Sequence, residues 1–184
     1  MKKYFIRISS SLLLLLLVLT WNGCDEFNSL PLNIPFTLKV HMEGSNADLT
    51  DSTSYCLSTD SDTYNEYKGK IKSLHFVEAA YRTLSVSPAD ISGDISVTLN
   101  DGNNNELFHS VIQGVTPADY MKPNSPYILQ LTQEQIDILN EYLNSLLNEG
   151  ACFTGLVTVN NISGNPPFSI DAAIDMVIEA DMEY

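Results

Sequence analysis

Residues 168–184, FSIDAAIDMVIEADMEY, decide the fold class because they alternate between apolar and polar side chains. The even positions are all apolar: Phe168, Ile170, Ala172, Ile174, Met176, Ile178, Ala180, Met182 and Tyr184. The polar residues stand at odd positions: Ser169, Asp171, Asp175, Glu179, Asp181 and Glu183. Successive side chains of a strand point to opposite faces, so this pattern predicts a long strand with one buried face. We interpret its carboxylates as a solvated face that also discourages pairing at a sheet edge.

Other segments closer to the N-terminus show strand patterns as well. They are residues 34–42, 70–87, 95–99, 107–112, 127–131 and 152–159. Residues 34–42 alternate strictly, whereas 70–87 are rich in β-branched and aromatic residues and predict one bent or bulged strand. The Asn-Asp-Gly turn at 100–104, set between two apolar runs, is a hairpin signal because these residues tolerate positive φ.

A single clear helix is predicted at residues 133–148. Thr132 and Gln135 fit a capping box, in which each side chain accepts a hydrogen bond from the other residue's backbone N–H. Apolar residues then recur at helical spacing on one face: Ile136, Leu139, Leu143, Leu146 and Leu147. Gly150 is placed to end the helix.

These elements predict a mainly β protein in which residues 34–184 form one domain. Several strands with hairpin turns and one capped α-helix near 133–148 fit an antiparallel two-layer β-sandwich, with the helix closing one end or edge. The polar segment 44–66 has no clear period, and we expect a long loop there, with a short strand at Tyr55 to Leu57 as an option.

The N-terminus carries an export signal. Lys2, Lys3 and Arg7 precede an apolar run at 12–19, and Gly23-Cys24 closes the segment. The run is short for a bilayer span, so residues 1–23 are expected to be a removed signal peptide and residues 24–33 a tether.

The cysteine at this cleavage point resembles the lipidation site of bacterial lipoproteins, and the layout of the rest resembles their β-sandwich members of unassigned function. The resemblance implies lipidation of Cys24, and hence an exported protein of the bacterial cell envelope, anchored in a membrane. Both the periplasmic and the cell-surface face are open. The alternative is an ordinary secretory signal, with Cys24 as a plain thiol.

The charge of the chain excludes some partners. Its formal net charge is −14, and removing residues 1–23 takes away three basic and no acidic residues. The chain without residues 1–23 has six basic and 23 acidic residues. Such a surface repels nucleic acid and anionic headgroups, favours solubility and leaves room for a basic partner.

Two further cysteines, Cys56 and Cys152, leave two interpretations open. Disulfides persist in exported proteins, so the pair is a candidate bridge. Two separate buried thiols are the alternative, since sequence does not establish proximity.

No sequence motif for catalysis, nucleotide binding or metal binding is present. His41, His75 and His109 fall on separate predicted strands and are expected to be strand-face residues. Loop carboxylates that could meet around calcium are Asp48, Asp51, Asp60, Asp62 and Glu66, but we predict no metal and no cofactor.

These observations favour a non-enzymatic binding or structural module. Its partner would be an envelope protein or an extracellular polymer, contacted through Tyr55, Tyr64 and Tyr67 of the predicted loop. The same tyrosines would otherwise cover one end of the sandwich. The alternative function is a carboxylate-based hydrolase of cell-wall or carbohydrate material, which needs two acids about 5–5.5 or 6.5–9.5 Å apart across a cleft.

Overall fold

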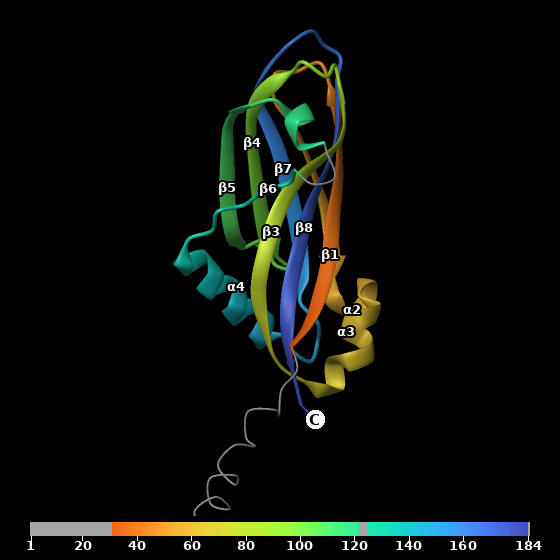
Figure 1. Ribbon diagram of the computed structural model, residues 1–184, viewed down its shortest axis with the longest axis vertical. Coiled ribbons are helices and arrows are strands. Elements are labelled where there is room, and N and C mark those ends of the chain that lie inside the picture. Colours follow the sequence, from red (N-terminus) through yellow and green to blue (C-terminus); the bar gives the residue numbers. More distant parts are fainter. Residues whose placement is uncertain (1–30, 122–124, 184) are drawn as a thin grey trace, which may run out of the picture.

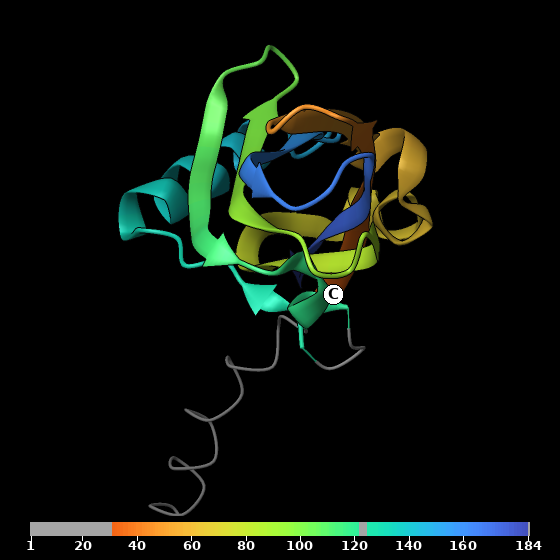
Figure 2. The ribbon, with the colours of Figure 1, turned by 90° about the horizontal axis from the view of Figure 1, so that it is seen from above.

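The computed structural model describes residues 31–121 and 125–183 and confirms an antiparallel two-layer β-sandwich (Figures 1 and 2). Sheet I has the order β1 (Pro31–Gly44), β8 (Phe168–Met182), β3 (Ile71–Ser87) and β6 (Tyr127–Ile128). Sheet II has the order β2 (Leu49–Cys56), β7 (Cys152–Ser163), β4 (Ser92–Asp101) and β5 (Glu106–Val115). The helical elements are α2 (Leu57–Asp60), α3 (Asp62–Tyr67), η1 (Lys68–Lys70), η2 (Pro117–Tyr120) and α4 (Gln133–Ser145).

The alternating C-terminal segment forms β8, and its even positions face the core as predicted. Ile174 lies opposite Leu38 of β1 and Tyr81 of β3, and all three side chains are buried. The strand is paired on both sides along its length, so the expectation that its carboxylates protect a sheet edge is wrong.

The two sheets come very close at Gly155 of β7. A Cβ atom at this position would lie 3.0 Å from Ile174 Cδ1 and 3.1 Å from Leu38 Cδ1 of the opposite sheet. Only glycine lets the two large aliphatic side chains fill this part of the core without displacement.

The predicted loop at 44–66 is wrong, because the segment forms β2, α2 and α3. β2 is rich in Ser and Thr, and its side-chain hydroxyls form hydrogen bonds with hydroxyls of the neighbouring strand β7. Thr50 Oγ1 lies 2.9 Å from Thr158 Oγ1, and Ser54 Oγ lies 3.0 Å from Thr154 Oγ1. Such cross-strand pairs stabilise a sheet on its solvent face. Pairing partners, which periodicity does not reveal, therefore make this polar segment a strand.

Two boundaries also differ from the predictions. β1 begins at Pro31, so residues 31–33 belong to the sheet, and residues 24–30 lie outside the described chain. The capping box of Thr132 and Gln135 is present, but α4 ends at Ser145. A turn then leads to Gly150, whose φ of +84° favours glycine.

Strand β3 is one bulged strand, as predicted. Its register against β8 shifts between Ile71 and Ser73, between Phe76 and Glu78, and between Thr83 and Ser85. Each shift leaves one residue of β3 without an opposite partner, and a bulge of this kind redirects the side chains near it.

Helix α4 closes the side of the sandwich between β3 and β5 (Figure 1). Asn144 Oδ1 accepts a hydrogen bond from Leu74 N at 3.0 Å, and Asn144 Nδ2 donates one to Leu74 O at 2.7 Å. One helical turn earlier, Asn140 Oδ1 accepts from Phe76 N at 2.7 Å. Four helical residues and two strand residues both advance by about 6–7 Å, which explains the match. The two asparagines thus occupy backbone groups that an added strand would need.

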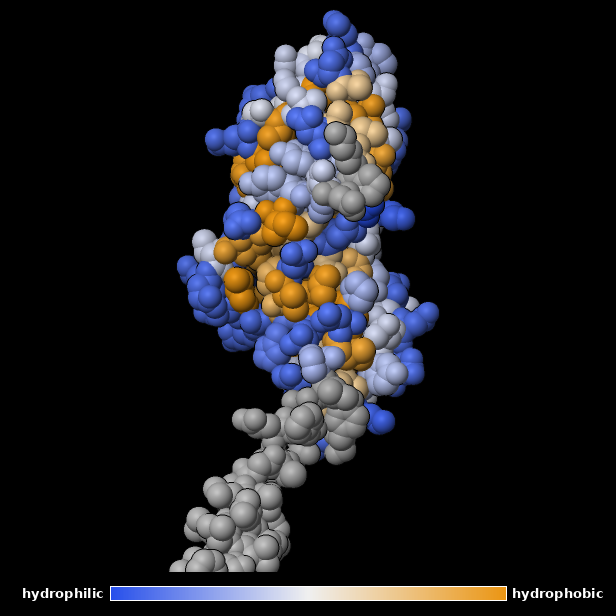
Figure 3. All heavy atoms as spheres, in the orientation of Figure 1, coloured by the Kyte–Doolittle hydropathy of each residue, from blue (hydrophilic) through white to orange (hydrophobic). Residues whose placement is uncertain are grey.

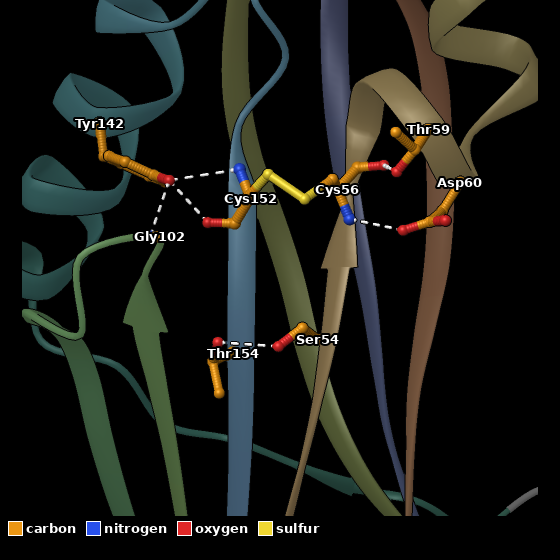
Figure 4. Close-up of a disulfide and its surroundings, with 8 residues drawn as sticks. All are labelled: Ser54, Cys56, Thr59, Asp60, Gly102, Tyr142, Cys152 and Thr154. Atoms are coloured by element: carbon orange, nitrogen blue, oxygen red, sulfur yellow. Dashed lines mark hydrogen bonds between the residues drawn. A yellow bond between two sulfur atoms is a disulfide. The ribbon is translucent and has the colours of Figure 1, made fainter.

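A disulfide joins Cys56 and Cys152, which lie opposite each other at the ends of β2 and β7 (Figure 4). Tyr142 of α4 reaches the same point, where its hydroxyl donates to Cys152 O at 2.6 Å and accepts from Gly102 N at 3.3 Å. The bridge, helix α4 and the β4–β5 hairpin are therefore fastened together at one end of the sandwich.

Candidate functional site

The outer face of sheet I carries the densest polar network of the described residues, and we take it as the candidate site. Its centre is the odd-numbered row of β8. Side chains of β1 and β3 hold Asp171 and Asp175 of this row, and side chains of β3 hold Asp181. Three carboxylates each collect partners from a neighbouring strand: Asp171, Asp175 and Asp181.

Asp171 lies between a histidine and a serine. His41 Nδ1 is 2.6 Å from Asp171 Oδ1, and Ser85 Oγ donates to Asp171 Oδ2. Ser85 and then His41 hold the pKa of Asp171 below its usual value, while Asp171 and then Glu43 raise the pKa of His41. In a serine-protease triad the imidazole stands between the hydroxyl and the carboxylate. Here the carboxylate stands in the middle, so this imidazole does not accept the serine proton.

Asp175 forms the one ion pair with arginine among the described residues. Arg82 donates from Nε at 2.9 Å and from Nη2 at 3.1 Å, and Thr37 Oγ1 donates at 2.8 Å. Both charged side chains are about one third exposed, at 32% each. The bidentate geometry fixes the guanidinium group of Arg82 against Asp175 and gives each carboxylate oxygen a donor.

Asp181 binds the same pair of residue types near the other end of β8, but here Ser73 Oγ also lies 3.0 Å from His75 Nε2. Ser73 Oγ donates to Asp181 Oδ2 at 2.6 Å, and His75 Nε2 lies 3.0 Å from the same carboxylate oxygen. Ser73 and, more weakly, His75 keep the pKa of Asp181 low. Since Asp94 and Asp101 are also shifted downward, every described carboxyl with a displaced pKa is displaced away from the range that a general acid needs.

An open hollow of about 510 Å³ adjoins Asp171, between β1, β2 and β3. Asp51 of β2 forms one wall, and its carboxylate accepts a hydrogen bond from His41 N at 2.9 Å. Lys39, Leu84 and Ser85 complete a wall of mixed polarity. The hollow thus holds acids that already serve as hydrogen-bond acceptors for the fold.

One of the three tyrosines predicted to form a contact surface is buried. Tyr64 is 0% exposed, and its hydroxyl donates to Leu147 O, so its prediction as a contact residue is wrong. Tyr55 stacks on Phe36 with ring centroids 4.7 Å apart, and Tyr67 packs against the core. Both are half-buried, so their role as contact residues stays a prediction.

The remaining predicted residues separate into three groups. His41, His75 and His109 lie on strands β1, β3 and β5, as expected. Within the described chain no three His, Cys, Asp or Glu side chains group in a way that could hold a metal. Cys24 lies outside the described residues. No helix in the described part of the chain is long and apolar enough to span a bilayer.

Sequence reasoning missed the apolar side chains that interrupt this polar face. Val77 and Leu84 occupy two of the bulge positions of β3 and are 52% and 37% exposed. Ile128 of β6, opposite Ala80, is 39% exposed. The signal in the sequence was a break in alternation: apolar residues stand side by side at Phe76-Val77, so one strand face cannot hold both.

The chain matches no protein-family model and no curated protein. Solved structures that resemble it include a chain of turnip yellow mosaic virus, 12% identical, with a TM-score of 0.42 over 85% of this chain and 95% of that one. A chain of tobacco necrosis virus is 12% identical, with a TM-score of 0.39 over 85% and 97%. At these values the likeness carries no argument about function or assembly.

Proposed function

We propose that the protein is a lipid-anchored module of the bacterial cell envelope that binds a partner and performs no catalysis. The observation that carries the anchor is Gly23-Cys24 directly after a basic and then apolar N-terminal segment. A cysteine that carries two or more acyl chains meets the requirement for stable membrane attachment.

The outer face of sheet I supports a binding role over a hydrolytic one. Its carboxylates Asp171, Asp175 and Asp181 are engaged by hydroxyl, imidazole and guanidinium groups, and the pKa values of Asp171 and Asp181 are lowered. A retaining or inverting hydrolase needs one acid with a raised pKa beside its nucleophile or base. The geometry therefore favours a recognition surface, and the hydrolase alternative gains no specific observation.

The orientation of the domain suits this proposal. β1 begins at Pro31, seven residues after Cys24, and its 14 residues span about 45 Å to Gly44 at the opposite end (Figure 1). The hollow beside Asp171 and a second one at Glu43, Phe168 and Ser169 lie towards that far end. An anchor at Cys24 would place them away from the bilayer.

Membrane fractionation tests the proposal. The wild-type chain, exported in a bacterial host, is expected to stay in the membrane pellet after high-salt and carbonate washes. The Cys24→Ser variant is expected in the soluble exported fraction or as an uncleaved precursor. An equal distribution of the two proteins would contradict the anchor.

A further inference from the structure

A patch on the outer face of sheet I combines exposed apolar side chains with carboxylates that have no partner among the described residues. We call it the Val77 patch and define it by Val77, Glu78, Ile128, Val177 and Glu179. Figure 3 views this face and shows apolar surface over β3 next to hydrophilic groups. Val77 has the highest exposed fraction, 52%, of the large apolar side chains in the described chain.

The register of sheet I places these residues together. Glu78 lies opposite Val177, and His75 lies opposite Glu179, two residues further along β8. Ala80 faces Asp175 on one side and Ile128 on the other, so Ile128 shares the outer face. Val77 lies at the bulge between Phe76 and Glu78, where its side chain is exposed next to Glu78.

No basic side chain of the described residues neutralises the negative charge of this patch. Arg82 is bound to Asp175 and His75 lies against Asp181, while Glu78 and Glu179 form no hydrogen bond or ion pair with the described residues. By the diagonal spacing of antiparallel strands, their Cβ atoms are about 7–8 Å apart. Two cationic side chains on one segment can span that distance.

Strand addition is not how this patch would engage a partner. On the edge of β3 that faces away from β8, backbone groups already have hydrogen-bond partners. Leu74 N and Phe76 N donate to Asn144 and Asn140, and Ala79 O accepts from Leu129 N at 2.9 Å. A partner therefore docks on the face of the sheet and covers it with side chains.

We propose that the Val77 patch docks a basic amphipathic segment of another protein. Apolar side chains of the segment cover Val77 and Ile128, and flanking Lys or Arg residues pair with Glu78 and Glu179. The argument is charge complementarity: six basic residues against 23 acidic ones in the chain without residues 1–23 exclude an acidic partner and disfavour an anionic lipid surface. The proposal deepens the proposed function, since it names the class of partner.

The test uses the full exported chain and a fluorescent synthetic peptide of alternating leucine and lysine as the probe. Fluorescence anisotropy is expected to show saturable, salt-sensitive binding to the wild type. The V77S/E78Q/E179Q variant is expected to bind about tenfold more weakly or worse. The control V111S/E106Q/E149Q makes the same changes at exposed positions outside sheet I and should bind like the wild type. Thermal unfolding of both variants verifies that they fold.

Three results would overturn the proposal. The peptide could fail to bind, or both variants could lose affinity equally, which would indicate diffuse charge attraction alone. Alternatively, the wild type could self-associate in sedimentation experiments and V77S abolish it, which would assign the patch to a second copy. None of these results bears on lipidation of Cys24, so failure here is distinguishable from failure of the proposed function.

Discussion

At the scale of single residues, the outer face of sheet I is organised by carboxylates of β8 that accept hydrogen bonds from side chains of the neighbouring strands. Asp171 and Asp181 each pair with a serine and a histidine, and Asp175 pairs with Arg82 and Thr37. The alternation of β8 predicted which side chains face outward. It could not predict their partners, because those partners lie about 90 to 140 residues earlier in the chain and depend on register.

The pair of His41 and Asp171 predicts a pH window for stability. The raised pKa of His41 means that protonated His41 stabilises the folded state. This stabilisation is fully present below pH 6.5, the pKa of the imidazole in the unfolded chain, and is lost as pH rises through the folded pKa. The lowered pKa of Asp171 means that its ionised carboxylate also stabilises the folded state. This stabilisation is present above pH 3.8, the pKa of the carboxyl group in the unfolded chain, and is lost as pH falls through the folded pKa. The difference in urea midpoint between wild type and His41→Gln should therefore be largest between about pH 4 and 6.5. A difference that does not change with pH would contradict the pairing.

At the scale of elements, α4 stabilises sheet I by presenting asparagines to a strand edge. Periodicity and the capping box predicted α4, but not its contact with β3, since a helical face does not specify what it covers. Likewise, the sequence did not predict β2, because its Ser and Thr content is typical of a loop. Its pairing with Thr158 and Thr154 of β7 is seen only in the structure.

Replacing Asn144 should expose this edge. In Asn144→Ala both Leu74 N and Leu74 O lose their partner, and each unmet group costs about 1–3 kcal/mol if water does not reach it. We expect a lower free energy of unfolding and a greater tendency to aggregate. Asn148→Ala, at an exposed position after the helix, is the matched control. Identical urea midpoints and light scattering for the two variants would contradict the role given to Asn144.

The central strand β8 should tolerate no carboxylate on its inner face. Ile174 is 0% exposed, so Ile174→Asp loses its apolar burial and places an unpaired charge in the core, at a cost of several kcal/mol. This is a large part of the stability of a domain this size. Asp175→Asn, one residue away, weakens only a part-exposed pair with Arg82, worth about 0.5–1 kcal/mol. Chemical denaturation of both variants measures the contrast, and similar losses would mean that β8 is placed in the wrong register.

At the scale of the whole molecule, two sheets are fastened by a core, by α4 and by one covalent link. Alternation and hairpin turns predicted the two-layer architecture. The Cys56–Cys152 bridge stayed open at the sequence level, because proximity of two cysteines 96 residues apart follows only from the pairing of β2 with β7.

The bridge should contribute substantially to stability. A closed loop of this length restricts the unfolded chain, and removing such a native disulfide typically costs about 2–5 kcal/mol. We expect that loss in the Cys56→Ala/Cys152→Ala variant and in the reduced wild type, measured by urea denaturation. A reductant should not destabilise the double variant further. If it does, or if reduction leaves the wild type unchanged, the bridge does not stabilise the fold.

We propose that lipid on Cys24 holds this acidic sandwich at a membrane, and labelling with a fatty acid is the direct test. Cells that express the wild type or Cys24→Ser are grown with an alkyne fatty acid, and the purified chains are examined for the label. We expect label on the wild type and none on Cys24→Ser, with the Cys56–Cys152 bridge intact in both. An unlabelled wild-type chain, or equal label on the two proteins, would contradict this proposal.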